Sequence, residues 1–435
     1  MRSAFLLVML SFAAIAVAQP SAFLSEGEAT TWERAPIEEE TLPEDPVDRF
    51  LEAQPVKAKV AQLMLVTLEG ATVPSANDMA FFKVCIPGGV VMPHAFKPET
   101  AAGYVNALRV MERASGIPLL IGADLYQLTQ ATRTIPKTFI QLPSLLSITA
   151  AGEEETTRRL GRFMAEHLSG MGFNLHLGPS LMLAPTLDSA MHTLQTFGSD
   201  PYFASQAGVL LFDAFKEAGV VMMPMGYPGG GANHAGRSAA VLTTPRPVIA
   251  TSDAMPYNDL IKHGAKLVHV GNVLVPTLDV ENRPASLSPV VMKDILRGDV
   301  GFEGVIVAGP LDDDIIQGRY KPEEVVVQAL MNGADMLYWG SNLLPAMRAI
   351  ELIARLVDDG AIPEERIEES LRRVLEFKQE MGMPTKAISE RQAQKISRQK
   401  ELIEESIQIE RRAITLVRNK DNVLPLEKKI SGPVG

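Results

Sequence analysis

The chain has 435 residues, 46% of them hydrophobic and 21% charged, and 41 Lys and Arg against 52 Asp and Glu give a formal charge of −11. This composition is that of a globular protein with one large domain or two ordinary ones, and it excludes a disordered or membrane-embedded chain. The acidic balance argues against a nucleic-acid partner, because phosphate binding depends on Lys and Arg. A single cysteine, Cys85, excludes an intrachain disulfide framework.

Residues 1–18 have the features of a secretory signal peptide. Arg2 gives a short positive region, residues 4–15 form an apolar run, and residues 16–18 (Ala-Val-Ala) make a small-x-small cleavage site. The apolar run is too short for a membrane span. We therefore predict cleavage after residue 18 and export to the periplasm or the extracellular space, with a buried N-terminal helix as the alternative. Residues 19–48 are acidic and rich in proline, which predicts a solvated leader.

From residue 49 onward, short apolar runs alternate with amphipathic stretches. The apolar runs are residues 63–68, 89–92, 118–123, 173–177, 220–225, 266–270, 304–308 and 335–339. The helical stretches include residues 99–115, 153–171, 205–218, 252–263, 322–332 and 344–358. Eight strands alternating with helices predict an α/β fold, a parallel (β/α)8 TIM-type barrel over residues 49–385. A doubly wound open sheet is the alternative, although no G-x-G-x-x-G motif follows an early strand.

Residues 386–435 follow the predicted barrel. The stretch 389–416 is charged and has a helical pattern. We interpret it as a solvated helix that packs on the barrel, rather than as a coiled coil, and the whole segment as a helical connector.

In a barrel of this kind, functional side chains lie at the carboxyl ends of the strands and in the loops after them. Polar groups are few there: Asp124 after the third strand, His234 after the fifth, and the acidic run 312–314 after the seventh. We expect His234 at the surface, and the acidic run at the start of a helix, where the helix dipole favours it. The other histidines lack ligand spacing, so we predict no metal and no cofactor.

Several motifs occur in a consistent order along the predicted barrel. They are residues 59–64 (KVAQLM), 118–124 (PLLIGAD), 197–201 (FGSDP), 227–231 (YPGGG), 283–288 (RPASLS), 301–306 (GFEGVI) and 413–419 (AITLVRN). Together they resemble the N-terminal barrel of glycoside hydrolase family 3, in particular its β-N-acetylhexosaminidase branch. The resemblance implies retaining hydrolysis of N-acetylglucosamine-type saccharides, and a connector that in longer members leads to a second domain.

The resemblance also implies where catalytic groups would lie, and most of them are absent. The family's nucleophilic Asp corresponds to Gly309, and its acid/base loop corresponds to residues 236–238, with Gly236 and Ser238 at its ends. Other polar positions of the family have become Tyr126, Gln127, Leu128, Met182, Gln195, Met225, Gly226, Gly230 and Asn272. Asp124, at the position that binds sugar hydroxyls in the family, remains. The expected saccharide-binding residues are Asp124, Gln195, Tyr227 and Asn272.

Three interpretations follow, because retaining hydrolysis needs two groups about 5 Å apart, one a nucleophile and the other an acid/base. The favoured one is a catalytically impaired relative that binds saccharide or supports a partner domain or protein, with a barrel mouth lined by methionine and glycine. The second is an active β-N-acetylhexosaminidase or β-glycosidase with a relocated catalytic pair, for which Asp312 and His234 are the candidates. The third is a structural or partner-binding barrel without a ligand.

Overall fold

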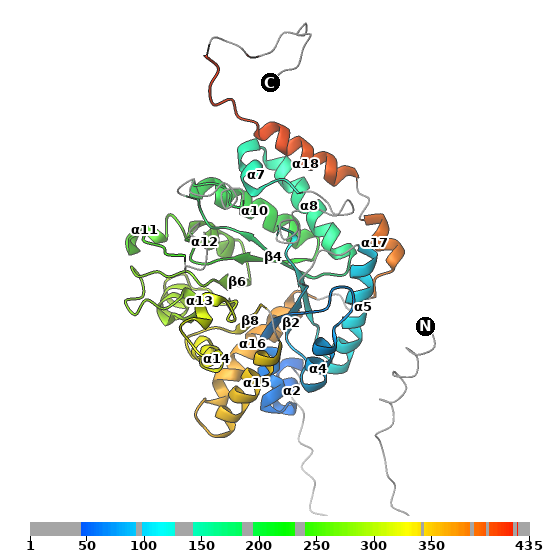
Figure 1. Ribbon diagram of the computed structural model, residues 1–435, viewed down its shortest axis with the longest axis vertical. Coiled ribbons are helices and arrows are strands. Elements are labelled where there is room, and N and C mark those ends of the chain that lie inside the picture. Colours follow the sequence, from blue (N-terminus) through cyan, green and yellow to red (C-terminus); the bar gives the residue numbers. More distant parts are fainter. Residues whose placement is uncertain are drawn as a thin grey trace, which may run out of the picture. The chain divides into compact units, whose positions relative to one another are not determined.

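Eight parallel strands form the centre of the fold, and helices lie around them (Figure 1). The strands are β1 (Met64–Thr67), β2 (Gly89–Val91), β3 (Leu120–Ala123), β4 (Leu175–Ser180), β5 (Val221–Met225), β6 (Leu267–Val270), β7 (Val305–Ala308) and β8 (Met336–Trp339). Each predicted apolar run overlaps one of them. Only β4 departs clearly from its predicted bounds, because it continues to Ser180 with a shifted register towards β5.

This computed structural model describes residues 45–92, 98–126, 142–184, 195–230, 240–340, 343–382, 387–396, 400–420 and 424. The predicted signal peptide and most of the predicted leader lie outside these residues. So do His234, Gly236 and Ser238, and also Gln127 and Leu128. The predictions made for them stay predictions.

The sheet closes on itself. Its strand order is β5-β4-β3-β2-β1-β8-β7-β6, with β1 paired to both β2 and β8. The two remaining edges meet just beyond β5, where Tyr227 forms a parallel bridge with Val270. The Tyr227 amide also donates to the carbonyl of His269 at 2.9 Å. The fold is therefore the predicted (β/α)8 barrel, and the doubly wound alternative is wrong.

Helices connect successive strands and pack on the outside of the barrel, and all six predicted helical stretches are helical. The helices are α2 (Pro46–Ala53), α3 (Val56–Gln62), α4 (Ala76–Val84), α5 (Pro98–Ser115), α7 (Leu145–Ala151), α8 (Glu154–Gly170), α10 (Pro201–Glu217), α11 (Arg246–Ile249), α12 (Met255–Lys262), η2 (Ala285–Leu287), η3 (Val290–Asp299), α13 (Asp314–Gln317), α14 (Pro322–Met331), α15 (Leu343–Asp358), α16 (Glu364–Glu380), α17 (Glu390–Ile396) and α18 (Lys400–Ala413).

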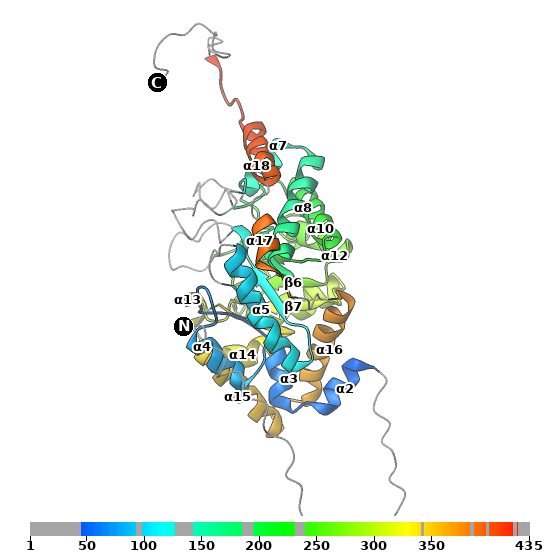
Figure 2. The same cartoon turned by 90° about the vertical axis from the view of Figure 1, so that its right-hand side faces the viewer.

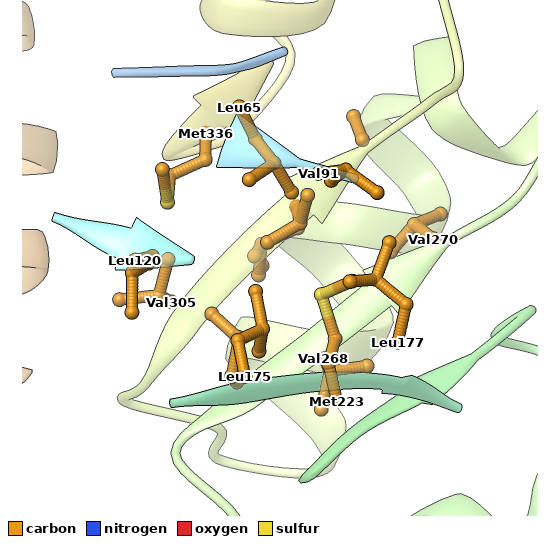
Figure 3. Packing of buried hydrophobic residues seen from close by; sticks show 14 of the residues in the cluster. Leu65, Val91, Leu120, Leu175, Leu177, Met223, Val268, Val270, Val305 and Met336 are labelled. Atoms are coloured by element: carbon orange, nitrogen blue, oxygen red, sulfur yellow. The ribbon is translucent and has the colours of Figure 1, made fainter. Parts of the chain in front are cut away.

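The core consists of Leu, Val, Ile and Met side chains from every strand, and Figure 3 shows part of this packing. The strand register places Leu65, Leu120, Leu175 and Met336 on one face of the sheet. Leu65 and Leu120 both pair with Gly89, Leu175 pairs with the residue two after Leu120, and Met336 lies two residues before Tyr338, the partner of Leu65. All four side chains are fully buried. This apolar layer supports the carboxyl ends of the strands above it.

Charged groups are buried at the opposite, amino-terminal end of the barrel. Asp335 is fully buried and accepts hydrogen bonds from Ser370 Oγ at 2.8 Å and from Arg373 Nη1 at 3.0 Å, and it also pairs with Arg297. Lys378, five residues after Arg373 in α16, is also buried, and its Nζ lies 3.2 Å from Gln62 Oε1. Burial lowers the pKa of Lys378 to about 7. This end of a TIM-type barrel serves stability.

The charged segment after the barrel packs on it, as predicted. Helix α17 lies against α5, and α18 lies against α7 and α8 (Figures 1 and 2). Ile409 of α18 is buried, Arg159 pairs with Glu405 at 3.0 Å, and Arg412 pairs with Glu153. The link from this segment to a second domain stays a prediction. None of the described helices has both the length and the apolar character needed to cross a bilayer.

Candidate functional site

A cavity of about 350 Å³ lies at the carboxyl ends of the strands. Because the strands are parallel and closed into a barrel, the residues that end them converge there. Its lining within the described part of the chain is Asp124, Tyr126, Leu145, Gly178, Pro179, Ser180, Met182, Gln195, Met225, Gly226, Gly230, Ala240, His269, Gly271, Asn272, Val273, Gly309, Pro310, Asp313 and Ile315. The volume suits a small ligand, since ligand pockets begin at about 300 Å³.

Most of the residues singled out in the sequence meet in this cavity. Asp124, Gln195 and Asn272, three of the four expected saccharide-binding residues, line it, and so does Gly309 at the nucleophile position. The methionines and glycines expected at the mouth also line it; they are Met182, Met225, Gly226 and Gly230. The structure thus brings these positions, which the resemblance singled out, together at the barrel mouth.

Tyr227 does not belong to this lining, in contrast to the expectation. Its side chain is 0% exposed and packs edge-on against Tyr257, with ring centroids 5.6 Å apart. Burial raises the pKa of the Tyr227 phenol. The residue instead closes the barrel through its backbone contacts with β6, so its role is architectural.

Asp124 follows β3 and is partly buried. Its Oδ1 accepts a hydrogen bond from the backbone amide of Tyr126 at 2.8 Å, which fixes the carboxylate at the end of the strand. Burial raises the pKa of Tyr126, and the Asp124 charge adds to that shift. Burial also raises the pKa of Tyr338 to about 12, with a smaller contribution from Asp124 and Asp312. Both phenols are therefore neutral beside the carboxylate at physiological pH.

Asn272 joins the loops after β6 and β7. Its Nδ2 donates to the carbonyl of Pro310 at 2.8 Å, and its Oδ1 accepts from Ser286 Oγ at 2.6 Å. The amide thereby holds the chain just after Gly309 against the loop after β6. Any ligand contact of Asn272 would come in addition to these two bonds.

The backbone at Gly309 is suited to glycine alone. Its φ is +142°, a region that L side chains rarely adopt. A Cβ added there would lie 2.6 Å from the carbonyl oxygen of Tyr338 and 2.9 Å from the amide nitrogen of Leu311. Both contacts are with backbone, so a rotamer change cannot relieve them. The position that the resemblance assigns to the nucleophile therefore has a backbone that excludes a side chain without a shift of β8 or of the loop.

Two further mouth positions also have glycine-specific backbones. Gly226 has φ +98°, and a Cβ there would lie 3.2 Å from both Met182 Sδ and Tyr257 Oη. Gly230 has φ +90°, and a Cβ there would lie 2.8 Å from Val273 Cγ2. Apolar groups and glycine backbone thus occupy the space at these positions.

The acidic run after β7 is largely engaged in local structure. Asp313 is the N-cap of α13 and accepts from the amide of Ile315 at 3.0 Å, which confirms the expected helix start. Asp312 Oδ1 accepts from the amide of Gly340 at 2.6 Å. Of these two carboxylates, Asp313 lines the cavity and Asp312 does not. The candidate for a relocated nucleophile is therefore Asp313 rather than Asp312.

His269 in β6 is a cavity residue that the sequence interpretation missed. It is 4% exposed, and its Nδ1 accepts from the amide of Gly226 at 3.1 Å. Burial lowers its pKa to about 4, so the imidazole is neutral at physiological pH. Its register with Val307 places it on the same sheet face as Met336 and Tyr338. Side chains alternate between the two faces of β6, so the sequence shows that His269 shares a face with Leu267 and Gly271. It does not show which of the two faces points into the barrel.

Within the described ranges, no group of three or more His, Cys, Asp or Glu side chains is arranged to hold a metal ion. The described lining offers two carboxylates, a neutral imidazole, two side-chain amides and two hydroxyls, those of Tyr126 and Ser180. These groups can hydrogen-bond to an uncharged polar ligand.

Comparison with known proteins agrees with this architecture. Residues 55–377 match the family model described as "Glycosyl hydrolase family 3 N terminal domain". A β-N-acetylglucosaminidase/β-glucosidase of Cellulomonas fimi is 23% identical over 310 residues, which is 68% of this chain and 53% of that protein. The β-hexosaminidase LpqI of Mycobacterium tuberculosis is 23% identical over 321 residues, covering 71% of this chain and 75% of that protein. This chain thus spans about half the length of the first of these relatives.

Solved structures show the same fold. A family 3 β-N-acetylglucosaminidase of Paenibacillus sp. has a TM-score of 0.72 and 23% identity, covering 85% of this chain and 70% of that chain. A β-N-acetylhexosaminidase of Beutenbergia cavernae has a TM-score of 0.66 and 20% identity, covering 75% of this chain and 99% of that chain. Because the family model matches most of its length, this chain belongs to glycosyl hydrolase family 3 through the N-terminal barrel domain.

Proposed function

We propose that this protein is an exported, hexosaminidase-like member of the family that binds N-acetylglucosamine-type saccharides at the barrel mouth and does not hydrolyse them. The observation that carries the proposal is the backbone of Gly309, which leaves no room for a Cβ at the nucleophile position. Glycine has no group that can attack an anomeric carbon, so no covalent glycosyl-enzyme forms there.

The energetic consequence is large. Removing the nucleophile from an enzyme that works by covalent catalysis costs several orders of magnitude in rate. The groups that would hold and protonate a sugar are also changed, since Met225, Gly226 and Gln195 occupy the corresponding positions. Without positioned charge around an oxocarbenium-like transition state, little stabilisation remains.

The saccharide part of the proposal is supported by Asp124 and by the relatives. Asp124 is held by the Tyr126 amide at the cavity wall, where its carboxylate can accept from a sugar hydroxyl. Relatives named β-N-acetylglucosaminidase and β-hexosaminidase support an N-acetylglucosamine-type ligand. Export is supported by the signal-peptide features of residues 1–18.

A second candidate function is hydrolysis by a relocated pair. It is favoured by the presence of Asp313 and His269 in the cavity lining. Against it, Asp313 is committed to capping α13, and His269 accepts a backbone hydrogen bond at Nδ1. A nucleophile in this role must reach the anomeric carbon at about 3–3.5 Å.

The test compares wild-type protein with two variants, Asp124→Ala and the triple variant Asp312→Ala/Asp313→Ala/Asp314→Ala. We expect calorimetry to show N-acetylglucosamine binding by the wild type and by the triple variant, and weaker binding by Asp124→Ala. We expect no turnover of an aryl N-acetyl-β-glucosaminide by any of them. Wild-type turnover that the triple variant loses would establish the relocated pair instead. Absence of both binding and turnover would favour a structural barrel.

A further inference from the structure

His269 carries a buried ring nitrogen, Nε2, that makes no hydrogen bond of good geometry with the described residues. The amide of Gly226 donates to Nδ1 at 3.1 Å, so Nδ1 is the acceptor nitrogen and the proton of the neutral ring resides on Nε2. Nε2 is buried and has no partner of good hydrogen-bond geometry among the described residues. The Gly309 backbone acts on the ring as a hydrogen-bond partner and raises its pKa, but burial lowers that pKa by more. A buried donor without an acceptor is unfavourable.

The ring faces the inside of the barrel, close to the predicted binding groups. Val307 is the register partner of His269, and Val307 is in turn paired with Met336, so these side chains share the inward face of the sheet. The His269 ring contacts the edge of Tyr338, with centroids 6.2 Å apart. His269 also belongs to the lining of the mouth cavity, together with Asp124. A ligand in the cavity would therefore lie against the ring that carries Nε2.

The charge of the lining restricts the ligand. Asp124 and Asp313 are the ionisable carboxylates of the described lining, and that lining contains no Lys or Arg. Two carboxylates in a partly enclosed site disfavour an anion. An uncharged sugar can accept from Nε2 through a carbonyl or hydroxyl oxygen and donate its hydroxyls to Asp124.

We propose that His269 Nε2–H is the buried donor that recognises an oxygen of an uncharged saccharide in the mouth cavity, opposite the acceptor Asp124. This inference rests on the proposed saccharide-binding function and adds to it the polarity and charge of the ligand. The low pKa of His269 keeps the donor in its neutral, Nε2-protonated form across the physiological range. Loss of the donor should weaken binding by about 5- to 100-fold.

The experiment follows the imidazole nitrogens of wild-type protein by ¹⁵N NMR during titration with N-acetylglucosamine at pH 7. We expect the Nε2 resonance of His269 to shift on binding. His176 is the internal control: it is also buried with an unpartnered Nε2, but it stacks on Phe215 and does not line the cavity, so its resonances should stay constant. Shifts at both residues or at neither, with binding still seen by calorimetry, would overturn the inference while leaving the proposed function intact.

Two variants test the proposal without the need to assign NMR resonances to individual histidines. His269→Phe keeps a ring against Tyr338 but removes the donor, whereas His269→Gln keeps an N–H donor; both are checked for folding by thermal melting. We expect His269→Phe to bind N-acetylglucosamine 5- to 100-fold more weakly than wild type, and His269→Gln to retain more of the affinity. Unchanged affinity in a folded His269→Phe would overturn the proposal. N-acetylglucosamine 6-phosphate should bind more weakly than the neutral sugar, and tighter binding would overturn the assignment of an uncharged ligand.

Discussion

Substitution of Gly309 tests whether the backbone of the nucleophile position has become specific for glycine. In Gly309→Ala, the new Cβ would lie 2.6 Å from the Tyr338 carbonyl oxygen at a φ of +142°. Holding an L residue in such a backbone region costs about 1–3 kcal/mol. Relieving an overlap with main-chain atoms by shifting packed structure costs about another 1–3 kcal/mol. We therefore expect the free energy of unfolding to fall by roughly 2–6 kcal/mol.

Urea denaturation of the variant and wild type measures this difference, provided that the m-values agree. Gly360→Ala is the matched control, because Gly360 also has a positive φ, +71°, but a Cβ there meets no atom within 4 Å. We expect about 1–2 kcal/mol for the control. Equal losses in the two variants would refute the reasoning, since the chain at Gly309 would then yield easily and could accept an Asp.

Three further outcomes are expected. Lys378→Met should raise the free energy of unfolding by about 2–4 kcal/mol at pH 6, where the lysine is charged in both the folded and the unfolded state. The gain should shrink between pH 7 and 10.5, because the folded pKa of about 7 lies below the unfolded value and the wild type becomes more stable in that range. Denaturation at several pH values checks this. Asp335→Ala should lower stability by about 3–5 kcal/mol, because it removes the buried carboxylate that pairs with Arg297 and Arg373 and leaves Arg373 with Glu369 alone; calorimetric melting checks it. Protein from a secretory host should lack residues 1–18 by intact mass, and retention of Met1 would contradict export.

The fold could be predicted well because its signal is strong. Strands buried on both faces give continuous apolar runs, and helices between them give an alternating pattern. The end of β4 was the main error in the strands, since Gly178-Pro179 is typical of a turn, whereas the strand runs through it to Ser180. Closure of the barrel depends on the bridge between Tyr227 and Val270, a long-range contact that no local pattern contains.

The site could be predicted only in part, because side-chain direction depends on tertiary register. Asp124 and Asn272 lie just after strand ends, where a barrel collects its functional groups, whereas Gln195 was found only through the family resemblance. Tyr227 lies at a strand end as well, but the closing bridge turns its side chain into the core. His269 was missed because it lies within a strand, and its inward direction follows from the register with β7. The backbone at Gly309 favours glycine because its φ is +142°, and this angle cannot be read from the sequence.

The central claim is that no covalent glycosyl-enzyme forms in this barrel. The most direct measurement is the intact mass of the wild-type protein, quenched under denaturing conditions during incubation with an aryl N-acetyl-β-glucosaminide. With Gly309 at the nucleophile position, we predict an unchanged mass and no released aryl group. A mass increase of one N-acetylglucosaminyl residue, mapped by peptide sequencing to a carboxylate such as Asp313, would contradict it.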